Sequence, residues 1–432
     1  MTLRVLIAGA GLGGLTLAHG LRNAGLDVAV FERGQRVTDP TAGYRIHIDA
    51  TGSRALHACL PTDVWNLFTA QSAAPPRGIA FTTEQLEQLM FIAETDPAHD
   101  PIGQAHPISR AGLRQLLLTG LDDVVAFDKR LVRYEQSNGQ VIAHFADGST
   151  ASGDVLVGAD GAHSVVRKQL LPDARVVDTG AAGIAGQLYL TERTRSRVPA
   201  ELLRQMTMVT PAGGLGMFMA PFQRQVGSSP STALGLPEHL FWTLIGPAQA
   251  LGLTHETPRG DAANLRQVVL DRVARWHPFL SWLVAESEPS TIVAVPLSTA
   301  RPVGPWPSTK MTLLGDAIHT MPPLQGLGGN TALRDAAVLC HHLVEVASDR
   351  ADLIAALHAY EAAMLAYGFD AVRASVQVCD GVATTSRLGR MAFRGVLRVA
   401  DRVPRLQRLL FARPTVSLPS VAARLAGQSR AA

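Results

Sequence analysis

The sequence predicts an α/β fold in which a parallel sheet opens the chain, a β-rich lobe interrupts it, and helices end it. Three observations predict this order. Residues 3–8, 13–24 and 27–33 read as strand, helix and strand, which is a βαβ unit. Between about residues 180 and 300, strand-like stretches alternate with loops rich in proline and glycine. A short buried strand that leads into a helix then returns at residues 311–315.

The composition sets the broad class of the protein. A chain of 432 residues exceeds the size at which one hydrophobic core usually keeps growing, so we expect two or more lobes. With 47% apolar residues, 17% charged residues and a net charge of +3, the chain is typical of a well-packed protein without a nucleic-acid footprint. Cys59, Cys340 and Cys379 form no CxxC motif, which indicates a reduced chain without a disulfide framework.

One N-terminal apolar stretch has the hydropathy of a secretion signal. Residues 5–18 nevertheless contain four glycines, and no small-residue cleavage site follows them, so a buried strand that enters a turn explains them better. No other stretch is long enough to cross a bilayer. We therefore expect a cytoplasmic protein with no stable membrane insertion and no metal site, and the sequence leaves its oligomeric state open.

The remaining elements follow from local patterns. Residues 50–70 look helical with Asp49 and Thr51 as possible caps, and Ser109 is expected to cap a short helix. Residues 78–93 look strand-like, and residues 225–237 show no periodicity and predict a loop.

After about residue 365 the chain is helical and rich in arginine. The spacing of three to four residues places these arginines on one helix face, which we interpret as solvated, with a membrane surface or an acidic partner as the alternative. They are Arg387, Arg390, Arg394, Arg398, Arg402, Arg405 and Arg408.

The first chemical motif is a glycine-rich turn between the first strand and the first helix. Gly9 permits the tight turn, Gly11 lets the backbone approach a pyrophosphate, and Gly14 lets the helix pack on the sheet. The free N–H groups of the helix N-terminus attract phosphate. Glu32 ends the second strand, where a carboxylate can bind a ribose diol, so FAD or NAD fits this site better than NADP. The alternative is a glycine-rich turn of another α/β protein.

Two further motifs lie far along the chain. At residues 154–167 an apolar strand ends at Asp160-Gly161 and a helix follows, which an ordinary strand–turn–helix would also explain. At residues 315–336, Asp316 at a strand end can bond a ribityl or ribose hydroxyl, and a loop with Pro322 and Pro323 leads to a helix that begins at Asn330. Its glycines, Gly326, Gly328 and Gly329, allow backbone to approach a flat ligand, and the helix N-terminus would stabilise negative charge on a reduced flavin.

Together the three motifs, in this order, resemble those of the class A FAD-dependent monooxygenases, the aromatic hydroxylases of the p-hydroxybenzoate hydroxylase type. The resemblance covers about residues 1–180 and 295–345. It implies a Rossmann-like FAD-binding domain of the glutathione reductase type, interrupted by a β-sheet substrate domain. The implied division is residues 1–75, 100–180 and 295–365 for FAD, 76–99 and 181–294 for substrate, and 366–432 for C-terminal helices.

The resemblance also implies which residues hold the cofactor. The set is Gly9, Gly11, Leu12, Gly13, Gly14, Glu32, Arg33, Arg45, Arg110, Asp160, Asp316, Gly326, Gly328, Gly329 and Asn330. Arg110 matches the arginine of the family's Ile-x-Arg-x-x-Leu helix start, with a surface arginine as the alternative. The chain departs from the family at Ile318, where a second alanine is common.

The implied reaction uses NADH or NADPH to reduce FAD, and O2 to form a flavin C4a-hydroperoxide that oxygenates the substrate. No protein nucleophile is needed. In residues 43–48, Arg45 could contact flavin, nicotinamide phosphate or substrate, and His47 could deprotonate a phenol. The alternatives are a surface ion pair and a satisfied strand histidine.

Large apolar residues alternate along the strands of the middle lobe. They could line a substrate wall or simply pack a core. The set is Met206, Met208, Met217, Met219, Phe222, Phe241 and Trp242. A wall of this kind would suit a hydrophobic aromatic or polycyclic substrate, as in antibiotic tailoring.

Two rival functions remain open at this point. A reductase or dehydrogenase could use the same fold, and a non-catalytic FAD-binding protein could sequester a ligand. A flavin halogenase is disfavoured because the sequence has no Trp-x-Trp-x-Ile-Pro motif.

Overall fold

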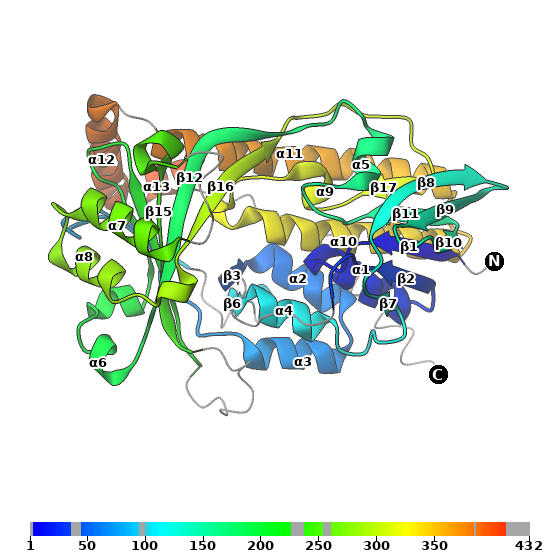
Figure 1. Cartoon of the computed structure of the whole chain (residues 1–432), viewed down its shortest axis with the longest axis horizontal. Helices are drawn as coiled ribbons and strands as arrows, with labels where there is room; N and C mark the ends of the chain where they lie inside the picture. The colour runs from blue at the N-terminus through cyan, green and yellow to red at the C-terminus, as the bar shows by residue number, and fades with distance from the viewer. Residues whose placement is uncertain are drawn as a thin grey trace.

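Two sheets organise the chain (Figure 1), and the second lies between a pair of helices and the rest of the molecule. The computed structural model describes residues 3–35, 45–94, 100, 102–225, 237–253, 261–383 and 386–411. The predicted loop at residues 225–237 lies almost entirely outside these residues, as does most of the segment that precedes Arg45.

The first sheet is parallel and contains the predicted βαβ unit. Its strands, in order, are β17 (Met311–Leu313), β11 (Val155–Gly158), β1 (Arg4–Ala8), β2 (Asp27–Phe31) and β7 (Val125–Ala126). The registers Val5↔Val155 and Leu156↔Met311 place the ends of the three motif strands side by side. The sequence predicts that a β-rich lobe interrupts the parallel sheet and that the chain then returns to it. This prediction is confirmed, because β17 follows the middle lobe in the chain and joins this sheet.

Helices and two small sheets surround the parallel sheet. The helices are α1 (Leu12–Asn23), α2 (Ala50–Cys59), α3 (Thr62–Gln71), α4 (Arg110–Leu117), α5 (Val165–Leu170), α9 (Asp316–His319), α10 (Leu327–Ala347) and α11 (Leu353–Ala383). The small sheets pair β3 (Arg45–Ile48) with β6 (His106–Ser109), and join β8 (Leu131–Ser137), β9 (Gln140–Phe145) and β10 (Thr150–Gly153).

The expected helix caps are largely confirmed. The Asp49 carboxylate accepts the N–H groups of Thr51 and Gly52, and the Ser109 hydroxyl accepts the N–H of Gly112 at 3.2 Å. Thr51 itself is a donor within α2 and not its cap.

The second sheet forms the middle lobe. Its order is β16 (Val293–Ala300), β12 (Val176–Tyr189), β15 (His239–Pro247), β14 (Gly216–Phe222), β13 (Met206–Val209), β4 (Gly78–Thr82) and β5 (Gln88–Ala93). All neighbours are antiparallel except β13 and β4. Residues 78–93, which break the strand–helix alternation in the sequence, thus supply the edge of this sheet.

The two faces of the middle sheet have different neighbours. One face packs against α7 (Ala262–Val273) and α8 (Pro278–Ala285) and forms a closed apolar core. On the other face Phe218 and Val295 pack with Leu324 of the third motif, so this face looks toward the parallel sheet. We call it the inner face, and Figure 1 shows β3, β6 and α10 on this side.

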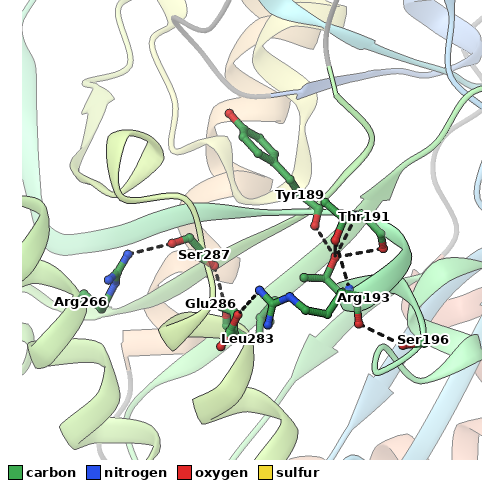
Figure 2. A network of polar contacts seen from close by, with 9 residues as sticks. Tyr189, Thr191, Arg193, Ser196, Arg266, Leu283, Glu286 and Ser287 are labelled. Carbon is green, nitrogen blue, oxygen red and sulfur yellow. Dashed lines mark hydrogen bonds and ion pairs between the residues drawn. The ribbon is translucent and has the colours of Figure 1, made fainter.

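A polar network closes the helix-covered side (Figure 2). The Trp242 indole donates to the Ser287 hydroxyl at 2.7 Å, and that hydroxyl donates to the carbonyl of Leu283 at 2.7 Å. Arg266 donates to the carbonyl of Ser287 at 2.8 Å, and Arg193 pairs with Glu286. Trp242 is therefore a structural residue of the far face and no part of a substrate wall.

The C-terminal helices α12 (Arg387–Arg402) and α13 (Pro404–Phe411) correct the expectation of one solvated arginine face. The buried Arg390 donates to the carbonyls of Pro211 and Leu215, and Arg394 donates to Thr210 and pairs with Glu84. These two arginines therefore hold α12 against the middle sheet. Within the described part of the chain, no helix combines the length and hydrophobicity needed to cross a bilayer.

Three elements cross the predicted domain boundaries. β12 runs through residue 180, β16 through residue 295, and α11 through residue 365. We therefore place the boundaries at the ends of these elements, because a continuous hydrogen-bonded strand or helix moves as one body.

Candidate functional site

The glycine turn of the first motif is built as its spacing predicts. Gly9 has φ of +109°, and a Cβ on it would lie 2.4 Å from the carbonyl oxygen of Ala159 in the second motif. A Cβ on Gly14 would lie 2.2 Å from the carbonyl oxygen of Gly9. At Gly11, by contrast, no described atom would lie within 4 Å. Gly9 and Gly14 thus serve the fold, whereas Gly11 faces open space at the N-terminus of α1.

Glu32 lies beside this turn and organises it. Its carboxylate accepts the N–H of Ala10 at 2.9 Å and that of Gly34 at 2.8 Å. Arg114 Nη2 lies 3.8 Å from Glu32 Oε2, and Arg114 Nε donates to the carbonyl of Ala10 at 2.9 Å. A carboxylate has further lone pairs for a ribose diol, so the predicted role of Glu32 is compatible with these bonds.

The second motif is joined to the third by an arginine. Asp160 accepts the N–H of Val165 at 2.6 Å at the start of α5, while its other carboxylate oxygen has no partner among the described residues. The buried Arg167 donates to the carbonyl of Ala162 at 2.8 Å and to that of Ala317 at 2.7 Å. Burial lowers the pKa of Arg167 from its ordinary value.

The third motif approaches the first through its glycines. A Cβ on Gly329 would lie 2.4 Å from Cδ1 of Ile46 and 4.0 Å from Cδ1 of Leu12, and one on Gly13 would lie 2.7 Å from Cδ1 of Leu314. The starts of α1, β3 and α10 therefore meet. Gly326, with φ of +66°, again faces space that no described atom occupies within 4 Å.

Asn330 has a more structural position than the sequence suggests. Its side chain accepts the N–H of Asp49 at 3.0 Å and donates to the carbonyls of His47 and Gly326, each at 2.8 Å. It is buried within α10 rather than placed at its first residue. Asn330 thus fixes β3 against the start of α10, and the segment that carries Arg45 and His47 is held there.

A buried carboxylate that sequence reasoning missed supports this loop. Asp335 accepts the N–H of Gly315 at 2.8 Å, His319 Nε2 at 2.6 Å and the Tyr367 hydroxyl at 2.7 Å. Burial lowers the pKa of His319, but the charge and the hydrogen bond of Asp335, together with the charge of Asp316, more than offset this effect, so the pKa is raised overall. The only feature of the sequence that could have indicated this role is that Asp335 lies within the third motif, five positions after Asn330.

The predicted arginines differ in their surroundings. Arg45 is half-buried, and its buried Nε and Nη2 have no hydrogen-bond partner in the described structure. Burial lowers the pKa of Arg45 to about 10, so the group is still charged at neutral pH. Arg33 and Arg110 are exposed, the latter at the first position of α4. Asp316 is half-buried at the start of α9.

The predicted substrate wall is divided between the two faces of the middle sheet. Met217 and Met219 lie in the apolar core under α7 and α8, so they pack the fold, and we withdraw them from the wall. Met206 and Phe241 pack together on the inner face. Phe222 and Met208 share that face, because strand side chains alternate and the registers are Phe222↔His239 and Met208↔Phe218.

His239 belongs to the same inner face, and no sequence signal singled it out. It is 3% exposed and stacks on the Phe222 ring with centroids 4.9 Å apart. Its Nδ1 bonds the carbonyl of Pro237 at 2.9 Å, which requires the proton on Nδ1 and leaves a lone pair on Nε2. Nε2 has no partner among the described residues. Burial, aided by the charge of Arg45, lowers the pKa of His239 to about 4.

These features fit an anionic dinucleotide and a flat ligand beside it. Two uncapped helix N-termini, those of α1 and α10, offer N–H groups, and both begin at glycines that face open space. Arg45, whose Nε and Nη2 have no partner among the described residues, adds positive charge close enough to His239 on the inner face to lower the pKa of that histidine. The inner face presents aromatic and methionine side chains with one buried imidazole acceptor.

Comparisons with known proteins all find FAD-binding proteins or FAD-dependent monooxygenases. A model of the "FAD binding domain" family matches residues 271–375, and one of the "NAD(P)-binding Rossmann-like domain" family matches residues 7–69. The crystal structure of a protein assigned as an FAD-containing monooxygenase from Photorhabdus luminescens is 34% identical, with a TM-score of 0.79. The match covers 88% of this chain and 98% of that one.

Curated relatives agree. The dual O-methyltransferase/FAD-dependent monooxygenase CTB3 of Cercospora beticola is 33% identical over 373 residues, which is 79% of this chain but only 42% of that protein. The aurachin C monooxygenase/isomerase of Stigmatella aurantiaca is 28% identical over 380 residues, covering 87% of this chain and 88% of that protein. This chain thus spans less than half of the length of the first relative.

Proposed function

Since this chain belongs to the class A FAD-dependent monooxygenase family, we propose that it oxygenates a hydrophobic aromatic or polycyclic small molecule with NAD(P)H and O2. One observation carries the proposal: the motif segments meet opposite an inner face that is apolar except for a few polar groups such as His239. A ligand site of this kind, mostly apolar with few polar groups, is what a flat organic substrate requires.

We propose that specific residues hold FAD. Gly11 and the N-terminus of α1 bind the diphosphate, Glu32 the ribose diol, and Asp316 the ribityl side. The start of α10, at Gly326, stabilises negative charge near the flavin ring, and Arg45 adds a cation there. When bound, FAD supplies hydride acceptance from the nicotinamide and the activation of O2.

The inner face would orient the substrate and exclude water. Met206, Phe222 and Phe241 provide apolar contact, and His239 Nε2 accepts a hydrogen bond from a substrate hydroxyl. With a pKa of about 4, His239 is too weak a base to remove a proton efficiently at neutral pH, so we assign it recognition. His47 remains a candidate base, with its main chain held by Asn330.

The function is tested with a panel of phenols and polyketides. We expect at least one compound to accelerate NAD(P)H oxidation and to gain one oxygen atom from ¹⁸O₂. Stimulated oxidation that releases only hydrogen peroxide with every compound would contradict the proposal. Reduction of a substrate without oxygen consumption would favour the reductase, and no stimulation by a tightly bound compound would favour the non-catalytic binding protein.

His239 is tested by substrate preference. His239→Phe keeps an aromatic ring beside Phe222 but removes the acceptor. An unpaired buried polar group costs about 1–3 kcal/mol, so we expect the preference for a phenol over its methyl ether to fall by about tenfold or more in kcat/KM. His358→Gln, at an exposed position of α11, is the control. An unchanged preference in His239→Phe would contradict the recognition role.

A further inference from the structure

The outer side of α12 is apolar, which reverses the usual orientation of an amphipathic helix on a protein. Leu388 is 81% exposed, Met391 62% and Val399 51%. Val396 and the C-cap residue Val403 are also exposed, and they lie three positions before and four positions after Val399. We call these five residues the α12 stripe.

The inner side of α12 explains why the stripe faces outward. Leu397 and Ala400 are fully buried against β5, in a small cluster with Leu89 and Met90. Arg390 and Arg394 bind main-chain carbonyls of the middle lobe, as described above. The helix is therefore attached by its own polar and apolar contacts, and the stripe remains as surplus apolar surface.

Charge distribution indicates what the stripe contacts. Residues 387–411, which span α12 and α13, contain seven arginines and one acidic residue, Asp401, for a formal charge of +6, whereas the whole chain has +3. Asp401 accepts the N–H of Phe91 at 3.0 Å, so it is engaged with the protein. Arg398 and Arg402 are also exposed, and they lie seven and eleven positions after Met391, which places them beside that residue on the helix.

From these observations we infer that α12 docks this protein on an anionic lipid surface. Apolar side chains of the stripe enter the boundary between headgroups and acyl chains, while the flanking arginines contact anionic headgroups. A second copy of this chain is the less suitable occupant, because a symmetric contact would bring two strongly basic segments together. Nucleic acid is also less suitable, since apolar side chains form no hydrogen bonds or ion pairs with phosphate groups.

Because α12 packs on the middle lobe, docking through α12 would also place that lobe near the lipid. Figure 1 places α12 at the end of the molecule opposite the N-terminus, and the helix packs on β5, the edge strand of the middle sheet. Docking would therefore bring the edge of the middle sheet close to the lipid.

The test is co-sedimentation of the full-length, FAD-loaded protein with vesicles. We expect binding to vesicles of phosphatidylcholine with phosphatidylglycerol, weak binding to pure phosphatidylcholine, and weaker binding at high salt. The triple variant Leu388→Ser, Met391→Ser, Val399→Ser should bind the anionic vesicles at least tenfold more weakly. Arg398→Gln with Arg402→Gln should reduce both the binding and its salt dependence.

Matched controls separate docking from general loss of apolar surface. Leu67→Ser and Val132→Ser alter exposed apolar residues elsewhere, and both should bind like the unaltered protein. Flavin absorbance and circular dichroism verify that each variant is folded. The inference is overturned if the unaltered protein does not sediment with anionic vesicles, or if the triple variant binds equally well. It is also overturned if light scattering finds a dimer that the triple variant converts to a monomer.

Discussion

Two glycines of the first motif, Gly11 and Gly14, have different roles. Gly14 lies against backbone, with its hypothetical Cβ 2.2 Å from a carbonyl oxygen, whereas Gly11 faces open space. The spacing of the motif predicts that Gly14 lets the helix pack closely and that Gly11 lets the backbone approach a ligand. The structure agrees with the first role at Gly14 and leaves space for the second at Gly11. The difference makes the cofactor assignment testable without measuring activity.

We expect Gly11→Ala to fold normally but to bind FAD at least tenfold more weakly. Its φ of −83° suits alanine, so the free energy of unfolding of the apoprotein should change by no more than about 1 kcal/mol. Gly14→Ala should instead lower that free energy by about 1–3 kcal/mol, because the new methyl group overlaps backbone. Chemical denaturation and flavin fluorescence titration measure both effects. Equal FAD affinity in Gly11→Ala and the unaltered protein would rule out Gly11 as the diphosphate contact.

At the scale of elements, the site depends on how helix starts are held. Asp335 joins three elements, because its carboxylate binds the loop before α9, His319 of α9 and Tyr367 of α11. Arg334 adds a contact over the Tyr367 ring at 3.6 Å. The sequence marks this stretch as a glycine-rich ligand loop, but the partners of Asp335 lie up to 32 positions away, so no local pattern reveals them.

Asp335→Ala should be among the more damaging single substitutions. It leaves His319 and two other donors buried without an acceptor, which costs about 3–5 kcal/mol of unfolding free energy. Asp335→Asn keeps one acceptor oxygen, and the Tyr367 hydroxyl can turn to accept from the amide, so we expect a smaller loss of about 1–2 kcal/mol. Urea denaturation compares the two with Asp380→Ala, an exposed control on α11. A smaller loss for alanine than for asparagine would refute this account.

At the scale of the whole molecule, two buried histidines link folding to pH. Burial lowers the pKa of both His106, on β6, and His239, on β15, to about 4. The unfolded chain binds these protons near pH 6.5, whereas the folded chain does not. The neutral histidines therefore contribute to the stability of the fold. This contribution is fully present above pH 6.5 and is lost as the pH falls toward 4.

We expect the free energy of unfolding to fall by at most about 3 kcal/mol for each histidine between pH 6.5 and pH 4. His106→Gln and His239→Gln should each flatten this decline. Denaturation curves collected across this pH range provide the measurement. The linkage would be disproved if both variants kept the slope of the unaltered protein.

The sequence by itself determined the parallel sheet, its interruption, the glycine turn and the identity of the family. These depend on local spacing, and hydrophobic periodicity and glycine positions record local geometry directly. Tertiary structure alone decided which methionines lie on the inner face of the middle sheet, since Met206 and Met217 have similar strand patterns but lie on opposite faces of one sheet. It also decided that Arg390 and Arg394 turn inward, because their acceptors lie more than 170 positions away in the chain.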